Sequence, residues 1–256
     1  LPAIRNEKAD VLLIKSIASA VRDSRLVLPV GLSAEGVETA YAAVRGAAHP
    51  CLQVSVPTST TQMEYICHKK PDQMLELIAE LVSAAKKTGA EVEFAAEDAT
   101  RSEKEFLYRA LDAAVTAGAD IVTLCDASDG MLPEDFGQFV QDVFAHVPAL
   151  SGKLVGVQCT DALRLAAACS IAAAKAGARL IKTAAGDDGL LSLETIAGIL
   201  RARGMDMGFS TDIAVTELTR TAGQVRRLAD VKRGAPALEK TGDRPRADAE
   251  PRLSRT

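Results

Sequence analysis

The sequence contains no tryptophan and few other aromatic residues, and this limits how its core can be built. There are three Tyr and six Phe, so aromatic residues make up only 4% of the 256 positions. Hydrophobic residues nevertheless reach 48% and charged residues 25%, which is typical of a globular protein and excludes wholesale disorder. We therefore expect a core made of Ala, Val, Leu and Ile.

The chain also lacks a basic excess and a long uninterrupted apolar run. Its net charge of −4 gives no reason to expect nucleic-acid binding. The most apolar stretch, Leu163–Ile181, is interrupted by Arg164, Lys175 and Arg179, whereas a membrane span needs roughly 20 apolar residues. Charged residues also interrupt the first ten positions, unlike a signal peptide. We expect no membrane segment and no nucleic-acid partner.

Cysteine and histidine are too few and too scattered to form a recognisable metal motif. The five Cys are an odd number without C-x-x-C spacing, and the three His show neither H-x-H nor H-x-x-x-H spacing. In a chain of this size, such cysteines are typical of reduced, mostly buried thiols. We therefore expect a cytoplasmic protein.

Short apolar runs alternate with longer amphipathic segments along the chain. Several of the apolar runs are continuous, as in strands buried on both faces. Between them, Pro71 is well placed to open one helix, and Ser102-Glu103-Lys104-Glu105 is a capping-box pattern for another. The predicted strands are Leu26–Gly31, Cys51–Val56, Glu91–Ala96, Ile121–Cys125, Lys153–Gln158 and Leu180–Thr183.

Three predicted helices end in almost the same way, at Gly89, Gly118 and Gly177, each followed by a predicted strand. Glycine ends helices because it adopts the left-handed conformation without a Cβ penalty. The spacings are 29 and 59 residues, and a fourth ending is expected near Ser151-Gly152. A strand–helix repeat of about 30 residues predicts a parallel sheet with crossover helices.

The fold class that this repeat favours is an α/β TIM (β/α)8 barrel, because no glycine-rich dinucleotide fingerprint follows any strand. Six strands are predicted where a barrel has eight, so we expect the first strand–helix unit and most of the second strand to be absent from this sequence. Leu1-Pro2-Ala3 could be the tail of another strand. A six-stranded sheet would expose its edges, so we expect further residues or a partner to cover them.

Three segments are predicted. Residues 1–203 form the barrel, and residues 204–231 form a helical segment after it, with an amphipathic helix over Thr211–Leu228. From 232 to 256 the chain has Pro among charged and small residues without apolar periodicity, which predicts a disordered tail.

The active site of a parallel barrel lies at the carboxyl ends of its strands, where polar residues gather in this sequence. They could supply acid–base groups, cation ligands or carboxylate recognition. Structural roles remain open as well: Asp98 and Thr100 could cap a helix, and Arg101 could be an ion-pair partner. Cys159 is a poor candidate nucleophile, because no His lies nearby in sequence. The charged residues at these ends are Glu97, Asp98, Arg101, Asp126, Asp129 and Asp161.

Three stretches resemble the 2-isopropylmalate synthase family and its homocitrate and citramalate synthase relatives. They are Gln62-Met63-Glu64-Tyr65, the more specific run Val92–Arg101 (V-E-F-A-A-E-D-A-T-R), and Ala117-Gly118-Ala119-Asp120. The similarity extends from Leu1-Pro2-Ala3, which looks like the end of the family's second strand, to about Leu228. It implies a TIM barrel that condenses acetyl-CoA with a 2-oxo acid in amino-acid biosynthesis, using a divalent Mg, Mn or Zn ion, and commonly a dimer.

The resemblance also implies site residues. Glu97 and Asp126 correspond to catalytic positions, and substrate-binding roles are expected for Thr58, Thr60, Arg101 and Ser128. The family's metal-binding His-x-His pair falls on Gln158 and Thr160, whose neutral oxygens are weak ligands for a transition metal.

The family's loop after its last strand is reduced to Gly186–Gly189, which is either a simple turn or a phosphate cradle. Two functions follow from this mixture of retained and replaced residues. The first is a 2-isopropylmalate synthase-like acyltransferase. The alternative is a diverged barrel without metal-dependent condensation, which binds a metabolite or a partner.

Overall fold

A computed structural model describes residues 1–5, 7–185 and 189–232. The predicted tail lies outside the described residues except for Lys232, and so do Gly186, Asp187 and Asp188 of the predicted loop. The described chain forms one six-stranded parallel sheet in sequence order. Its strands are β1 (Leu26–Pro29), β2 (Pro50–Pro57), β3 (Glu91–Glu97), β4 (Ile121–Asp126), β5 (Leu154–Cys159) and β6 (Leu180–Lys182).

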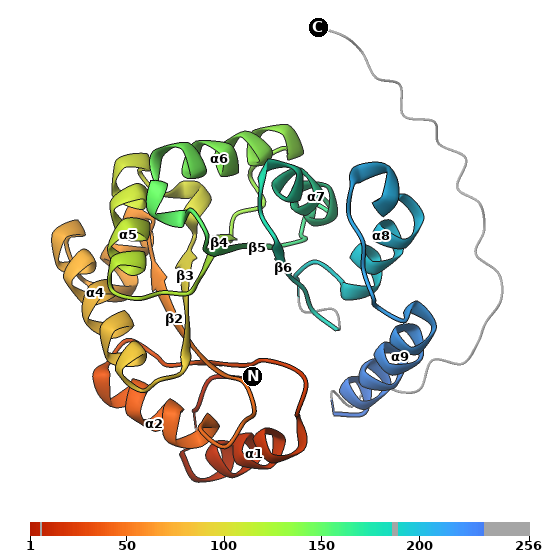
Figure 1. Ribbon diagram of the computed structural model, residues 1–256, viewed down its shortest axis with the longest axis horizontal. Helices are drawn as coiled ribbons and strands as arrows, with labels where there is room; N and C mark the ends of the chain where they lie inside the picture. Colours follow the sequence, from red (N-terminus) through yellow and green to blue (C-terminus); the bar gives the residue numbers. More distant parts are fainter. Residues whose placement is uncertain (6, 186–188, 233–256) are drawn as a thin grey trace, which may run out of the picture.

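The sheet curls, and helices α1, α2 and α4–α7 lie around its outside (Figure 1). Helices α8 and α9 follow the last strand. Within the described residues, no helix is both long and apolar enough to cross a bilayer. The helices are α1 (Glu7–Ala20), α2 (Ala34–Val44), α3 (Thr60–Gln62), α4 (Pro71–Lys87), α5 (Lys104–Thr116), α6 (Pro133–His146), α7 (Ala166–Ala176), α8 (Leu193–Met207) and α9 (Val215–Lys232), with a π-helix at Met63–Cys67 and 3₁₀ turns at Ala99–Arg101 and Pro148–Leu150.

The strands are buried as their continuous apolar patterns predict. Every residue of β4 is buried, and so are the five central residues of β3. Helices cover one face of such a sheet and side chains fill the concave face, so neither face needs polar residues. The core is aliphatic, as the scarcity of aromatic residues indicates, although Phe94 and Phe136 are also fully buried.

The repeated glycines end helices as predicted. Gly89, Gly118 and Gly177 have φ values of +83°, +114° and +124°, and Gly152 has +78° at the fourth expected ending. Each lies between a helix and the following strand, where the chain must reverse. The helix after β3 is capped differently from the prediction. Glu103, not Ser102, accepts the hydrogen bonds of the first turn of α5, because the Ser102 hydroxyl donates to Thr58 Oγ1 instead.

The described sheet is part of a barrel and is not closed by its own strands. β1 and β6 each pair on one side only within the described residues. The ammonium group of Leu1 donates to the carbonyl of Val27 at 2.8 Å, so the first residues lie beside β1, although they are not assigned to a strand. The six strands and their covering helices confirm the predicted α/β barrel class, with six strands of the expected eight.

Candidate functional site

The sharp turn after β3 holds a fully buried carboxylate. Asp98 has a left-handed backbone with φ of +59° and an exposed fraction of 0%. Its carboxylate accepts a hydrogen bond from Ser59 Oγ at 2.5 Å, and Arg101 Nε donates to Oδ1 at 2.8 Å. Asp98 raises the pKa of the Arg101 guanidinium by this hydrogen bond and by its charge. Asp98 therefore fixes Arg101 at the rim, as the ion-pair interpretation predicts. It precedes the 3₁₀ turn Ala99–Arg101, but its side chain makes no capping hydrogen bond to that turn.

Glu97 is the last residue of β3, at the mouth of the sheet, and is half-buried. Its Oε1 accepts a hydrogen bond from Ser55 Oγ of β2 at 2.5 Å. Its backbone carbonyl accepts two more, from the amide and the hydroxyl of Thr58, both at 2.9 Å. Among the described residues, no group donates to Oε2. Glu97 is thus held firmly, with one carboxylate oxygen left for a ligand.

Asp126 ends β4 and is buried, and it receives three hydrogen bonds on one oxygen. Thr100 Oγ1 donates to Asp126 Oδ1 at 2.7 Å, and the amide and hydroxyl of Ser128 donate at 3.2 and 3.1 Å. Thr100 belongs to the turn that follows Glu97, so this contact joins the ends of β3 and β4. The two predicted catalytic carboxylates therefore belong to one hydrogen-bonded rim.

The other predicted substrate-binding residues differ in their surroundings. Thr58 is fully buried and accepts from Ser102 Oγ at 2.7 Å, so its hydroxyl is engaged in holding the rim. Ser128 is half-buried beside Asp126. Thr60 begins α3 and is exposed, and its hydroxyl makes no hydrogen bond within the described part of the chain. Only Thr60 among these three has its hydroxyl free to meet a ligand.

The positions expected to hold a metal do not form a metal site. Gln158 lies in β5, and the Thr160 hydroxyl donates to the backbone carbonyl of Asp126 at 3.2 Å. Asp126 Oδ1 already accepts three hydrogen bonds. Among the described residues, no group of three His, Cys, Asp or Glu side chains could hold an ion. The residues present therefore do not fit a divalent metal.

The remaining candidates have structural roles. Asp129 Oδ2 accepts from the Leu163 amide at 2.6 Å, and Asp161 Oδ1 accepts from the Ala166 amide at 3.1 Å. Both carboxylates thus hold the loop that leads into α7. Burial raises the pKa of Cys159 to about 12, so its thiol stays protonated near neutral pH and is unsuited to nucleophilic attack.

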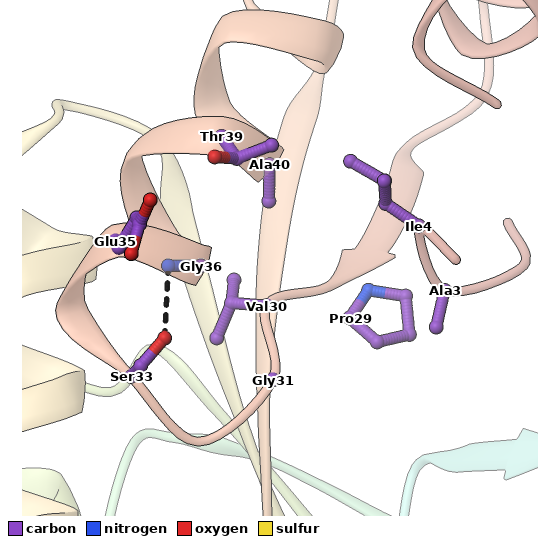
Figure 2. A pocket seen from close by; sticks show the side chains of 10 residues that line it. All are labelled: Ala3, Ile4, Pro29, Val30, Gly31, Ser33, Glu35, Gly36, Thr39 and Ala40. Carbon is purple, nitrogen blue, oxygen red and sulfur yellow. Dashed lines mark hydrogen bonds between the residues drawn. The ribbon is translucent and has the colours of Figure 1, made fainter. Parts of the chain in front are cut away.

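A pocket of about 280 Å³ opens at the same end of the sheet, beside β1 (Figure 2). Val30, Gly31 and the start of α2 line it together with Ala3 and Ile4. The amide of Gly36 donates to Ser33 Oγ there. A Cβ atom at Gly36 would lie 2.1 Å from the carbonyl oxygen of Val30, so α2 can approach β1 this closely only with glycine.

Several rim residues were not expected from the sequence. Ser55, Ser59 and Ser102 hold the predicted residues in place, but single serines near strand ends carry no distinctive pattern. A stronger signal was available for Glu93 and Lys182, because each is a charged residue within an apolar strand. These two side chains form an ion pair with Nζ 2.5 Å from Oε1.

Residues 5–225 match the HMGL-like family. The chain belongs to this family. A curated 2-isopropylmalate synthase of Carboxydothermus hydrogenoformans is 34% identical over 219 residues, covering 84% of this chain and 43% of its own. The enzyme of the same name from Aquifex aeolicus is 33% identical over 226 residues, covering 86% and 44%. This HMGL-like chain thus spans less than half the length of these relatives.

Solved structures show the same fold. A hydroxymethylglutaryl-CoA (HMG-CoA) lyase from Brucella melitensis superposes with a TM-score of 0.70 at 17% identity, covering 89% of this chain and 83% of its own. The Bacillus subtilis HMG-CoA lyase gives a TM-score of 0.66 at 18% identity, covering 89% and 77%. These lyases and the present chain therefore share the HMGL-like barrel. At this level of identity the likeness shows the fold and not the reaction.

Proposed function

We propose that the protein is an acyltransferase of the 2-isopropylmalate synthase type, which joins the acetyl group of acetyl-CoA to a 2-oxo acid. The observation that carries this proposal is the turn from Glu97 to Arg101. It lies at the carboxyl end of β3 and is linked by hydrogen bonds to the ends of β2 and β4. Sequence identity above 30% to enzymes of that name supports the same reaction class.

In this proposal Glu97 is the group that moves a proton. Ser55 stabilises one carboxylate oxygen and orients the other toward the mouth, where Oε2 can take a proton from the acetyl methyl group or return one to the product. Arg101 keeps guanidinium N–H groups beyond those bound to Asp98, so it can also meet an anionic substrate. The exposed hydroxyl of Thr60 is a further donor at the rim.

The test is a thiol-release assay with acetyl-CoA and a panel of 2-oxo acids, with and without added Mg²⁺, Mn²⁺ or Zn²⁺. We expect CoA release from at least one pair of substrates, and a loss of about 100-fold or more in Glu97→Gln. Glu91→Gln is the matched control, because Glu91 lies at the opposite end of β3 and pairs with Arg25 at the surface. Absence of CoA release from every pair would contradict the proposal.

A second candidate function follows from the residues at the metal positions. The described residues at these positions do not fit a metal. Gln158 and Thr160 favour a diverged barrel that binds a metabolite without metal-dependent condensation. The measurement is metal content after incubation with Zn²⁺ or Mn²⁺ and desalting. One tightly held ion per chain, lost in Gln158→Ala or Thr160→Ala, would refute this alternative.

We also propose a cytoplasmic location. All five cysteines are free thiols, and four of them are buried. Cytoplasmic proteins keep their thiols reduced, whereas secreted proteins of this size commonly form disulfides.

A further inference from the structure

An ion pair spans the inside of the curled sheet. Lys182 is the last residue of β6 and Glu93 lies in β3, so two strands separate them along the sheet. Their side chains meet with Nζ 2.5 Å from Oε1. A contact across two intervening strands is possible only on the concave side, because the curl brings β3 and β6 toward each other there. Both side chains therefore point into the barrel interior.

The two partners of this ion pair are not equally buried. The Glu93 side chain is 1% exposed, and the Thr123 hydroxyl also donates to its Oε1 at 2.5 Å. The Lys182 side chain keeps 21% of its surface exposed. An ammonium group has three N–H donors, and Glu93 accepts from it at only one oxygen. The Lys182 side chain is thus partly accessible in the interior, and a buried carboxylate holds its ammonium group.

Strand register places the backbone of Lys182 beside residues of the candidate site. Lys182 is the register partner of Gln158 in β5, and Gln158 is the partner of Cys125 in β4. Gln158 is the position at which the resemblance puts a metal ligand. Burial above all raises the pKa of Cys125, and the charges of Glu97 and Lys182 also act on this thiol. Glu97 and Lys182 therefore both act on the Cys125 thiol within the interior of the sheet.

We propose that Lys182 is a substrate-binding residue whose ammonium group binds the carboxylate of a small carboxylic acid inside the barrel. Lys182 supplies a positive charge to the interior, and the described residues offer no metal site that could supply one. A singly charged carboxylate suits the position better than a phosphate dianion, because Glu93, Glu97 and Asp126 would repel the second negative charge. The proposal does not depend on acyl transfer, since binding is measured without turnover.

Calorimetric titration with pyruvate and 2-oxobutyrate tests this on the full chain without acetyl-CoA. We expect wild-type protein to bind at least one of them, and Lys182→Gln to weaken binding about tenfold or more, equal to about 1.4 kcal/mol. Glu93→Gln should bind as tightly as wild type or more tightly, because it releases the ammonium from its partner. Lys175→Gln, on the exposed surface of α7, is the charge-matched control and should leave binding unchanged.

A purely structural ion pair gives a different pattern. Losing either partner would then affect binding to the same degree, through the stability of the fold, and that result would overturn the proposal. Absence of binding of both acids to wild type would overturn it as well. If Lys182→Gln alone does not fold, the double variant Glu93→Gln/Lys182→Gln removes both charges together, and it too must lose binding. Binding that survives in the double variant would contradict the assignment.

Discussion

At the scale of single residues, the five thiols differ in burial. Burial is the main cause that raises the pKa of Cys51 and Cys159 to about 12 and that of Cys169 to about 11, and it raises that of Cys125 as well. Cys67, at the end of the π-helix, is only half-buried; burial raises its pKa too, while the charge of Lys69 lowers it. Because the thiolate is the reactive form, a thiol with a pKa near 12 has on the order of one in ten thousand of its molecules reactive at pH 8.

We therefore predict that Cys67 alone reacts quickly with a thiol reagent in the native protein. Titration with an aromatic disulfide reagent at pH 8 should show about one fast equivalent, with all five thiols reacting after denaturation. Cys67→Ser should abolish the fast phase, whereas Cys51→Ser should leave it intact. A fast phase of two or more equivalents would show that the buried thiols are more accessible than the structure indicates.

The sequence predicts the charged members of the site better than the groups that hold them. Glu97, Asp126 and Arg101 stand in a distinctive run or directly after a strand, so position alone indicates their role. Ser55 and Lys182 act through partners 42 and 89 positions away. Such pairings depend on strand register and on the curl of the sheet, which local patterns do not contain.

At the scale of helices and strands, three similar glycine endings offer an internal comparison. Gly89, Gly118 and Gly177 all have positive φ, but their surroundings differ. A Cβ atom at Gly89 would meet nothing within 4 Å. At Gly118 it would lie 2.9 Å from Lys86 Cγ, which belongs to a flexible side chain, and at Gly177 it would lie 3.0 Å from the ring of Phe144.

We predict that the loss of stability caused by substitution with alanine increases from Gly89 to Gly118 to Gly177. Gly89→Ala should lose about 1 kcal/mol from backbone strain alone, a decrease in Tm of about 2–4 °C. Gly118→Ala should lose slightly more, and Gly177→Ala the most, because the Phe144 ring packs against the core and cannot move freely. Thermal unfolding followed by circular dichroism gives the order. Equal losses at all three would mean that the contacts with Lys86 and Phe144 relax without cost.

Gly198 provides a control at which alanine should raise the stability instead of lowering it. It lies inside α8, has no positive φ, and has open space around a Cβ atom. Gly198→Ala should therefore stabilise the protein by up to about 1 kcal/mol, because alanine favours the helix.

The glycine-ended repeat also explains why the elements could be located from the sequence. All six predicted strands are present, and no end of a strand differs from its predicted position by more than two residues. The helix predicted over Thr211–Leu228 begins later, at Val215, and reaches Lys232. Only amphipathicity indicated this helix in the sequence, without a glycine ending or a following predicted strand, so its ends were placed less well. The division into residues 1–203 and 204–231 stays a proposal.

At the scale of the whole molecule, the sheet presents two edges. Within the described residues, β1 and β6 bond to a neighbouring strand on one side only, and the curl stays open between them (Figure 1). Unpaired strand edges expose backbone donors and acceptors that another strand can satisfy. Two leucines of α1, Leu12 and Leu13, are also exposed, at 67% and 52%. The strand edges and this apolar helix face are therefore two competing surfaces for association.

We predict that a chain of these 256 residues associates through the strand edges and forms a dimer. Size-exclusion chromatography with light scattering should give about twice the chain mass of 26.9 kDa, with dissociation on dilution. The double variant Leu12→Lys/Leu13→Lys should remain dimeric, because it changes the α1 face and leaves both strand edges intact. If that variant becomes monomeric, the helix face makes the contact instead. A cooperatively folded monomer at all concentrations would show that the open sheet needs no partner to be stable.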